Sequence, residues 1–160
     1  MRKWFLFSVL LVACSAALAR PANEQQKNKE IARTFFEDVL GQNHLERYAE
    51  SHSKDFVAHG ETQDASLEED MAAAKEERRI IPDVKIRVNQ MVAEQDLVAV
   101  YWTAWGTNTQ PGMGLPGAGK KISVNGMTIF RFKAGKICEE WSVWDMLSVM
   151  QQAGVVPSPQ

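Results

Sequence analysis

Four strand-like segments follow one another in the second half of this chain, and their order constrains the fold more than any other feature. They cover residues 83–93, 97–107, 121–133 and 136–144. In the first segment the apolar residues Val84, Ile86 and Val88 alternate with other residues, which is the period of a half-buried strand. Turns are expected at residues 94–96 and at Gly135. This spacing predicts a four-stranded meander.

The first half of the chain has helical periodicity instead. From Asn28 the apolar residues recur every three or four positions, and Gly41 ends the pattern. A second short helix is expected over residues 42–51, and a third begins at Ser66 and stops before Pro82. Helices followed by a meander predict an α+β domain, in which a curved mixed or antiparallel sheet packs on three N-terminal helices. A small-molecule pocket would lie between the two layers.

Residues 1–19 have the pattern of an export signal. The basic residues Arg2 and Lys3 precede an apolar run over residues 4–13, and residues 17–19, Ala-Leu-Ala, form a small-x-small cleavage site. The apolar run is too short to cross a bilayer, which takes about 20 helical residues. We therefore expect an exported protein, either periplasmic or secreted.

An alternative processing site lies at Cys14, because residues 11–14, Leu-Val-Ala-Cys, resemble a bacterial lipobox. The protein would then be anchored by a lipid at Cys14. The residues that follow stay apolar, which favours soluble export. After the signal we expect a disordered polar lead over residues 20–27 and one domain over residues 28–156.

Charge and cysteine content argue against several other classes of protein. The chain has 18 basic and 20 acidic residues, a net charge of −2, which disfavours nucleic acid and anionic membranes as partners. Cys138 is the only cysteine after Cys14, so the mature chain cannot form an internal disulfide. The three histidines have no metal-binding spacing, so no metal is expected, and we expect His44 and His52 to be solvated.

Taken together, these segments resemble the SnoaL-like polyketide cyclase family. The similar stretches are residues 28–45, 55–59, 82–84, 96–107, 135–145 and 147–154. The resemblance implies the nuclear-transport-factor-two-like cone fold and, as in the characterised cyclases, chemistry without a cofactor. In those cyclases an aspartate moves the proton during intramolecular aldol closure of a polyketide ester, and the match places Asp145 at its position. The implied partner is a small apolar or aromatic, polyketide-like molecule.

The position of Asp145 in its strand supports a similar role. One strand face carries Glu139, Trp141, Val143 and Asp145. If this face lines the pocket, apolar walls would raise the pKa of the Asp145 carboxyl toward neutrality, and the Trp141 indole would offer a flat binding surface. The alternative is a helix cap, because Asp145 directly precedes a helical pattern at Met146.

His59 is the second predicted catalytic residue, at a position that the family often fills with histidine. Its imidazole could relay a proton to Asp145, and the alternative is a histidine in a surface turn. Trp102 is predicted to face inward, with simple core packing as its alternative. The other predicted substrate contacts are Trp141, Phe36, Met127 and Leu115. Leu115 lies in a glycine- and proline-rich loop, residues 107–120, that we expect to be a mobile flap.

Three functions stay open on the sequence alone. The first is a cofactor-free cyclase, or a related lyase or isomerase, that uses Asp145 with help from His59. The second is a non-catalytic protein that binds a small apolar ligand. The third is a ketosteroid-isomerase-like enzyme, which would need Tyr48 or Tyr101 as a donor in the pocket. Tyr101 and Trp105 share the outer strand face, which indicates a homodimer through that face.

Overall fold

The structure is a computed structural model and describes residues 16–157, with side chains from residue 22 onward. Its centre is a six-stranded sheet in the order β2-β1-β8-β7-β4-β3. The strands are β1 (His52–His59), β2 (Ala65–Ser66), β3 (Lys85–Glu94), β4 (Leu97–Asn108), β7 (Lys120–Lys133) and β8 (Lys136–Trp144), and β5 (Pro111–Gly112) and β6 (Leu115–Pro116) form a separate hairpin. Within the six-stranded sheet all neighbours are antiparallel except β1 and β8, which are parallel.

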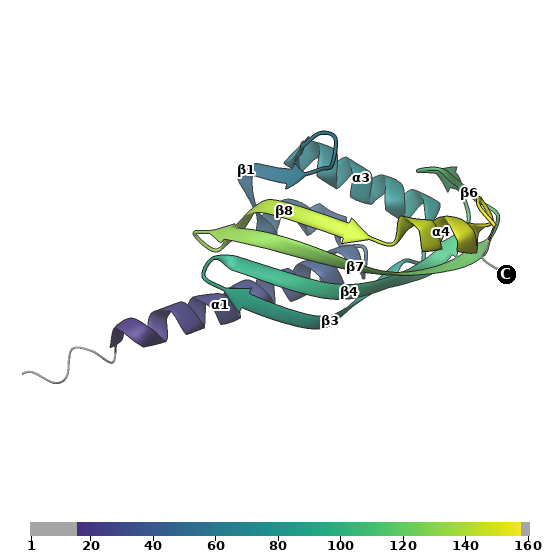
Figure 1. The fold of residues 1–160 in the computed structure, drawn as a ribbon. Coiled ribbons are helices and arrows are strands. Elements are labelled where there is room, and N and C mark those ends of the chain that lie inside the picture. The colour runs from purple at the N-terminus through teal and green to yellow at the C-terminus, as the bar shows by residue number, and fades with distance from the viewer. Residues whose placement is uncertain (1–15, 158–160) are drawn as a thin grey trace, which may run out of the picture.

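The helices cover the sheet and close its end. They are α1 (Ala16–Thr34), a π-helical segment (Phe35–Leu40), a 3-10 turn (Leu45–Arg47), α2 (Tyr48–Ser51), α3 (Leu67–Ile80) and α4 (Met146–Ala153). Figure 1 shows α3 running beside β1, α4 following the end of β8, and the N-terminal part of α1 extending beyond the sheet. Within residues 16–157, no helix combines the length and the apolar character that a membrane crossing requires.

The predicted meander is confirmed, since β3, β4, β7 and β8 pair in sequence order. Gln95 takes a positive φ of 53° in the β3–β4 turn, where Glu94 pairs with Leu97. Ala134 and Gly135, with φ values of 52° and 74°, form the two-residue turn between β7 and β8. Positive φ at both central residues matches the twist of a tight hairpin. These short turns hold the four strands in one continuous sheet.

The helices before the sheet differ from the prediction. Residues 20–27, predicted as a disordered lead, belong to α1, because most residues from 22 onward are strong helix formers. The last turn before Gly41 is π-helical, and the Gly41 amide donates to the Phe36 carbonyl over 2.9 Å. The predicted helix over residues 42–51 is split into a 3-10 turn and α2. Most of the predicted export signal, residues 1–15, lies outside the described residues.

The main core lies between the helices and one face of the sheet. It contains Ala32, Phe35, Phe36, Val39, Tyr48, Phe56, Val88, Val98, Val100, Trp102, Ala104, Phe130, Phe132 and Ile137. Phe36 lies against Trp102, with ring centroids 5.8 Å apart. We predicted a solvated His52, but its side chain is buried in this core among Phe35, Tyr48 and Phe56. The turn into β1 points its ring inward, which the polar sequence around it did not reveal.

A second core anchors the loop that we predicted to be a mobile flap. It contains Ile80, Ile81, Val84, Leu115, Ile122, Val149 and Ala153. The buried Asn108 amide donates to the Gln110 carbonyl over 2.8 Å and accepts from the Gly117 amide over 2.8 Å. Leu115 is therefore a packing residue between α3 and α4, and the loop is fixed at both ends.

Candidate functional site

The two faces of β8 have different surroundings, and this decides which side chains can form a site. Ser142 lies 2.7 Å from Thr128, whose side chain is only 1% exposed, so Ser142 and Glu140 point into the interior. Glu139 lies 3.2 Å from Arg131 on the opposite face. We predicted that the face with Glu139 lines the pocket, and the structure places that face outside.

Asp145 is the exposed N-cap of α4 in this structure. Its Oδ1 accepts a hydrogen bond from the Ser148 amide over 2.9 Å. Its strand neighbour Val143 is 64% exposed, so no apolar wall surrounds this end of the face. The geometry therefore agrees with the helix-cap alternative for Asp145.

His59 lies on the outer face, at the end of β1. Its ring stacks on Trp141 at 4.7 Å with an interplanar angle of 16°. Its Nε2 is 3.1 Å from Glu139 Oε2, and its Nδ1 is 3.3 Å from Asp64 Oδ1. Arg131 lies over the same indole, 5.7 Å from the ring centroid. His59 thus belongs to a surface charge cluster, and none of these contacts joins it to Asp145.

The other predicted contacts divide between the two faces. Trp102 and Phe36 are buried and face the interior. Met127 is 50% exposed on the outer face, Trp141 lies there too, and Leu115 belongs to the second core. Only Trp102 and Phe36 border the polar groups described next.

A chain of hydrogen bonds crosses the interior from β4 to β8. The Trp102 Nε1–H donates to Thr128 Oγ1 over 3.0 Å. Thr128 Oγ1 is 2.7 Å from Ser142 Oγ, and the Ser142 hydroxyl donates to Glu140 Oε1 over 2.5 Å. The chain ends on a carboxylate that faces helix α3.

A second polar pair approaches Glu140 from the helices. The buried Tyr48 hydroxyl, at the start of α2, donates to Asp70 Oδ2 on α3. Burial raises the pKa of Tyr48, and the charges of Asp70 and Glu140 raise it further. Burial also raises the pKa of Asp70, although the bond from Tyr48 opposes this. Tyr48 therefore remains a protonated donor beside two carboxyl groups.

Glu140 has the most unusual acidity in this group. Burial and the nearby charge of Asp70 raise the pKa of Glu140 to about 7, against the lowering effect of the Ser142 hydrogen bond. Glu140, like Asp70 and Ser142, is half-buried as a residue, and protein atoms surround its carboxyl closely. Burial raises the pKa of Glu77 on α3 as well, and Arg78 opposes that shift. A carboxyl that titrates near neutrality can both accept and release protons.

The sequence contained partial signals for these residues. Alternation places Glu140 and Ser142 on one strand face with Cys138, and Asp70 and Glu77 are seven residues apart on α3, which puts both on one side of the helix. We chose the other face of β8 because it carries Trp141 and Asp145. The pairing of Tyr48 with Asp70, across 22 positions, had no local signal.

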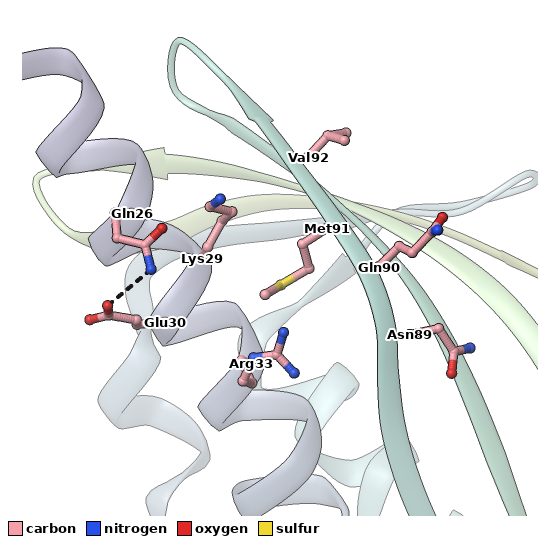
Figure 2. A pocket seen from close by; sticks show the side chains of 8 residues that line it. All are labelled: Gln26, Lys29, Glu30, Arg33, Asn89, Gln90, Met91 and Val92. Atoms are coloured by element: carbon pink, nitrogen blue, oxygen red, sulfur yellow. Dashed lines mark hydrogen bonds between the residues drawn. The ribbon is translucent and has the colours of Figure 1, made fainter.

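No group of three or more histidine, cysteine, aspartate or glutamate side chains within the described part of the chain is arranged to hold a metal ion. Two of the surface depressions in the described part of the chain lie outside the inner site. One of about 310 Å³ lies beside His59 and Arg131 on the outer face. The other, of about 570 Å³, lies between α1 and β3, and Figure 2 shows Met91 pointing from β3 toward α1 there. Neither depression includes Glu140 or Asp70.

Comparison with known proteins identifies the family. The sequence model of the SnoaL-like polyketide cyclases matches residues 30–153, most of the chain. The chain belongs to the SnoaL-like polyketide cyclase family. The family and its fold support a cyclase or isomerase type of role. A search of curated proteins found no match.

Solved structures share the fold of this SnoaL-like protein. AclR, a proposed hydroxylase from Streptomyces galilaeus, is 23% identical, with a TM-score of 0.78 over 85% of this chain and 86% of AclR. A proposed SnoaL-like polyketide cyclase from Jannaschia Sp. CCS1 is 22% identical, with a TM-score of 0.74 over 83% and 95%. IdmH, a proposed polyketide cyclase from Streptomyces antibioticus, is 23% identical, with a TM-score of 0.71 over 79% and 98%. At these identities the likeness concerns the fold.

Proposed function

We propose that this SnoaL-like protein is a cofactor-independent enzyme of the cyclase or isomerase type, in which Glu140 transfers the proton. The observation that carries the proposal is the pKa of Glu140, raised to about 7 by burial and by Asp70. General acid–base catalysis works best when the pKa of the group lies near the working pH. The acid/base role that the family resemblance implied for Asp145 passes, in this proposal, to Glu140.

The reaction begins at a carbon next to a carbonyl group. Glu140, as a carboxylate, takes a proton from that carbon, and the electron pair of the C–H bond forms an enolate. The Tyr48 hydroxyl, which donates to Asp70 in the structure, turns to donate a hydrogen bond to the enolate oxygen. Burial and the charges of Asp70 and Glu140 raise the pKa of Tyr48, so its hydroxyl keeps its proton at neutral pH.

The fate of the enolate separates the two reaction types. In a cyclase the enolate carbon attacks a second carbonyl of the same molecule, a C–C bond forms, and the new alkoxide takes the proton back from Glu140. In an isomerase Glu140 returns the proton to a different carbon. The buried Tyr48 donor favours keeping the isomerase as a second candidate, because such an enzyme needs a tyrosine beside its carboxylate base. Trp102 and Phe36 offer an apolar border for a small polyketide-like substrate.

The test compares Glu140→Gln with the wild type on two probes. A poly-β-keto ester reports ring closure by mass spectrometry and NMR, and a β,γ-unsaturated ketone reports isomerisation by ultraviolet absorption. We expect Glu140→Gln to lower the rate by about 10²- to 10⁴-fold, the usual contribution of a general acid or base. Asp145→Asn is the matched control and should keep its activity. Full activity of Glu140→Gln would exclude this role, and binding of both probes without turnover would favour a non-catalytic ligand carrier.

We also propose that the outer sheet face joins two copies of the chain. Tyr101, Met127 and Val143 are directly opposite one another on β4, β7 and β8, and all three are exposed. Exposed apolar side chains in one stripe indicate a protein interface. Light scattering of the wild type should give the mass of a dimer, and Met127→Glu should give that of a monomer. A wild-type monomer at high concentration would rule out this dimer.

We propose, finally, that residues 1–19 direct export and are removed. The intact mass of protein from a bacterial periplasm should match a chain beginning at Arg20. A mass that includes a diacylglycerol on Cys14 would instead support the lipid-anchored alternative, and an uncut chain in the cytoplasm would contradict export.

A further inference from the structure

We infer that Trp102, Thr128 and Ser142 act as a one-way hydrogen-bond chain that orients the carboxyl of Glu140, and that Thr128 is a positioning residue which never touches the substrate. This inference rests on the proposed function of Glu140. The three groups come from different strands, β4, β7 and β8, so the chain exists only in the folded sheet.

The direction of the chain follows from its two ends. An indole N–H can only donate, so the Thr128 oxygen accepts from Trp102 over 3.0 Å. An ionised carboxylate can only accept, so the Ser142 hydroxyl must donate to Glu140 over 2.5 Å. The Thr128 proton then points at the Ser142 oxygen, 2.7 Å away. Each hydroxyl therefore accepts one bond and donates the next.

The surrounding residues hold the indole in the position that this chain requires. Trp102 pairs with Gly126 on β7, and a Cβ at Gly126 would come within 2.2 Å of the indole ring. The missing side chain lets the indole lie across β7 and reach Thr128, two residues further on. Phe36 covers the ring from the helix side at 5.8 Å. The indole has one polar atom, and the fold directs it to Thr128.

The hydrogen-bond chain counteracts two influences that raise the pKa of Glu140. Burial and Asp70 favour the protonated form of Glu140, whereas the Ser142 bond favours the ionised form. A hydrogen bond to a charged acceptor is roughly twice as strong as one between neutral groups. Without Thr128, the Ser142 hydroxyl loses its donor and can rotate away from the carboxylate. Loss of the chain therefore favours the protonated form of Glu140.

The experiment measures the titration of Glu140 directly, by the carboxyl ¹³C shift in labelled protein, with Glu140→Gln used to assign the signal. Thr128→Val keeps the shape of the side chain and removes its hydroxyl, and Thr128→Ser keeps the hydroxyl as the matched control. We expect Thr128→Val to move the midpoint upward by about 0.5 to 1 pH unit, the size of one hydrogen bond. Thr128→Ser should titrate like the wild type.

The same shift should appear in the acidic limb of the pH–rate profile of Thr128→Val, with little change in KM. Ser142→Ala breaks the chain one link later, so it should give an equal or larger shift even if Thr128→Val folds poorly. Identical titration midpoints of Glu140 in the wild type, Thr128→Val and Ser142→Ala would contradict the inferred role of the hydrogen-bond chain. The acid/base role of Glu140 would not be affected. A wild-type Glu140 that does not titrate near neutrality would instead contradict the proposed function.

Discussion

Glu139 and Glu140 are neighbours in the sequence, yet they belong to two different regions of the molecule. Glu139 lies on the outer face, where the Arg131 guanidinium lies 3.2 Å and His59 Nε2 lies 3.1 Å from its carboxylate oxygens. Glu140 lies on the inner face near Asp70 and accepts a hydrogen bond from the Ser142 hydroxyl, and its pKa is raised to about 7. The outer carboxylate is stabilised by a guanidinium cation, whereas burial and a second carboxyl group make the ionised form of the inner one costly. Such costly groups are typical of functional sites.

The largest expected effect is a difference in the free energy of unfolding between variants of Trp102 and Trp141. Trp102→Ala removes a buried indole and the first donor of the inner chain, and should lower the free energy of unfolding by about 3–5 kcal/mol. Trp141→Ala on the outer face removes a stacking partner of His59 and should cost about 1 kcal/mol. Chemical denaturation of both variants measures the difference. Equal losses in the free energy of unfolding would mean that side chains on the two faces of the sheet are packed equally tightly.

The second prediction contrasts the two histidines. Burial lowers the pKa of His52 from 6.5 to about 4, so the unfolded chain takes up a proton at a higher pH than the folded one. Neutral His52 therefore makes its full contribution to the free energy of unfolding above pH 6.5, and this contribution is lost as the pH falls toward 4. This loss amounts to about 3 kcal/mol at most.

The measurement is the free energy of unfolding between pH 7 and pH 4. His52→Gln should be less stable at pH 7 but should show a flatter pH dependence than the wild type. The control, His59→Gln, changes a histidine on the outer face and leaves the buried His52 in place, so the loss of stability that His52 causes between pH 6.5 and pH 4 should remain. A wild-type slope in His52→Gln would show that other groups cause the acid sensitivity.

The third prediction concerns the stability cost of Glu140. The folded pKa of about 7 lies above the ordinary glutamate value of 4.5, so this carboxyl favours folding at low pH and opposes it as the pH rises from 4.5 through 7. Glu140→Gln removes that cost and should stabilise the protein above pH 7 by about 1–3 kcal/mol while activity is lost. Glu139→Gln should change stability by less than about 1 kcal/mol. Thermal melts at pH 5 and pH 8 test both variants, and a destabilised Glu140→Gln at pH 8 would contradict the assignment.

The smallest effect is expected at Asp145. Asp145→Ala removes the cap of α4 and should cost about 0.5–2 kcal/mol, whereas Asp145→Asn can still accept from the Ser148 amide and should cost less. Both variants should keep their turnover. A loss of turnover with unchanged stability in Asp145→Asn would return the acid/base role to Asp145.

Much of the fold could be predicted because its signals are local. The Ser66 capping box, the turn at Gln95 and the glycine turn after β7 each depend on residues within a few positions of one another. The site was harder to predict because alternation assigns residues to two faces without saying which face is covered. Both faces of β8 carry an acid and an aromatic residue, so the pattern around Trp141 and Asp145 was ambiguous.

The sequence by itself determined the order of the elements, the meander and the family, since hydrophobic period and turn residues act over short distances. Only the tertiary structure decided that Glu140 faces inward. That outcome depends on α2 and α3 bringing Tyr48 and Asp70 over one face of the sheet, where burial and a second carboxyl raise the pKa of Glu140. Contacts between residues 70 positions apart have no signature in either segment alone, because a pKa depends on the charges and solvent that surround the folded group.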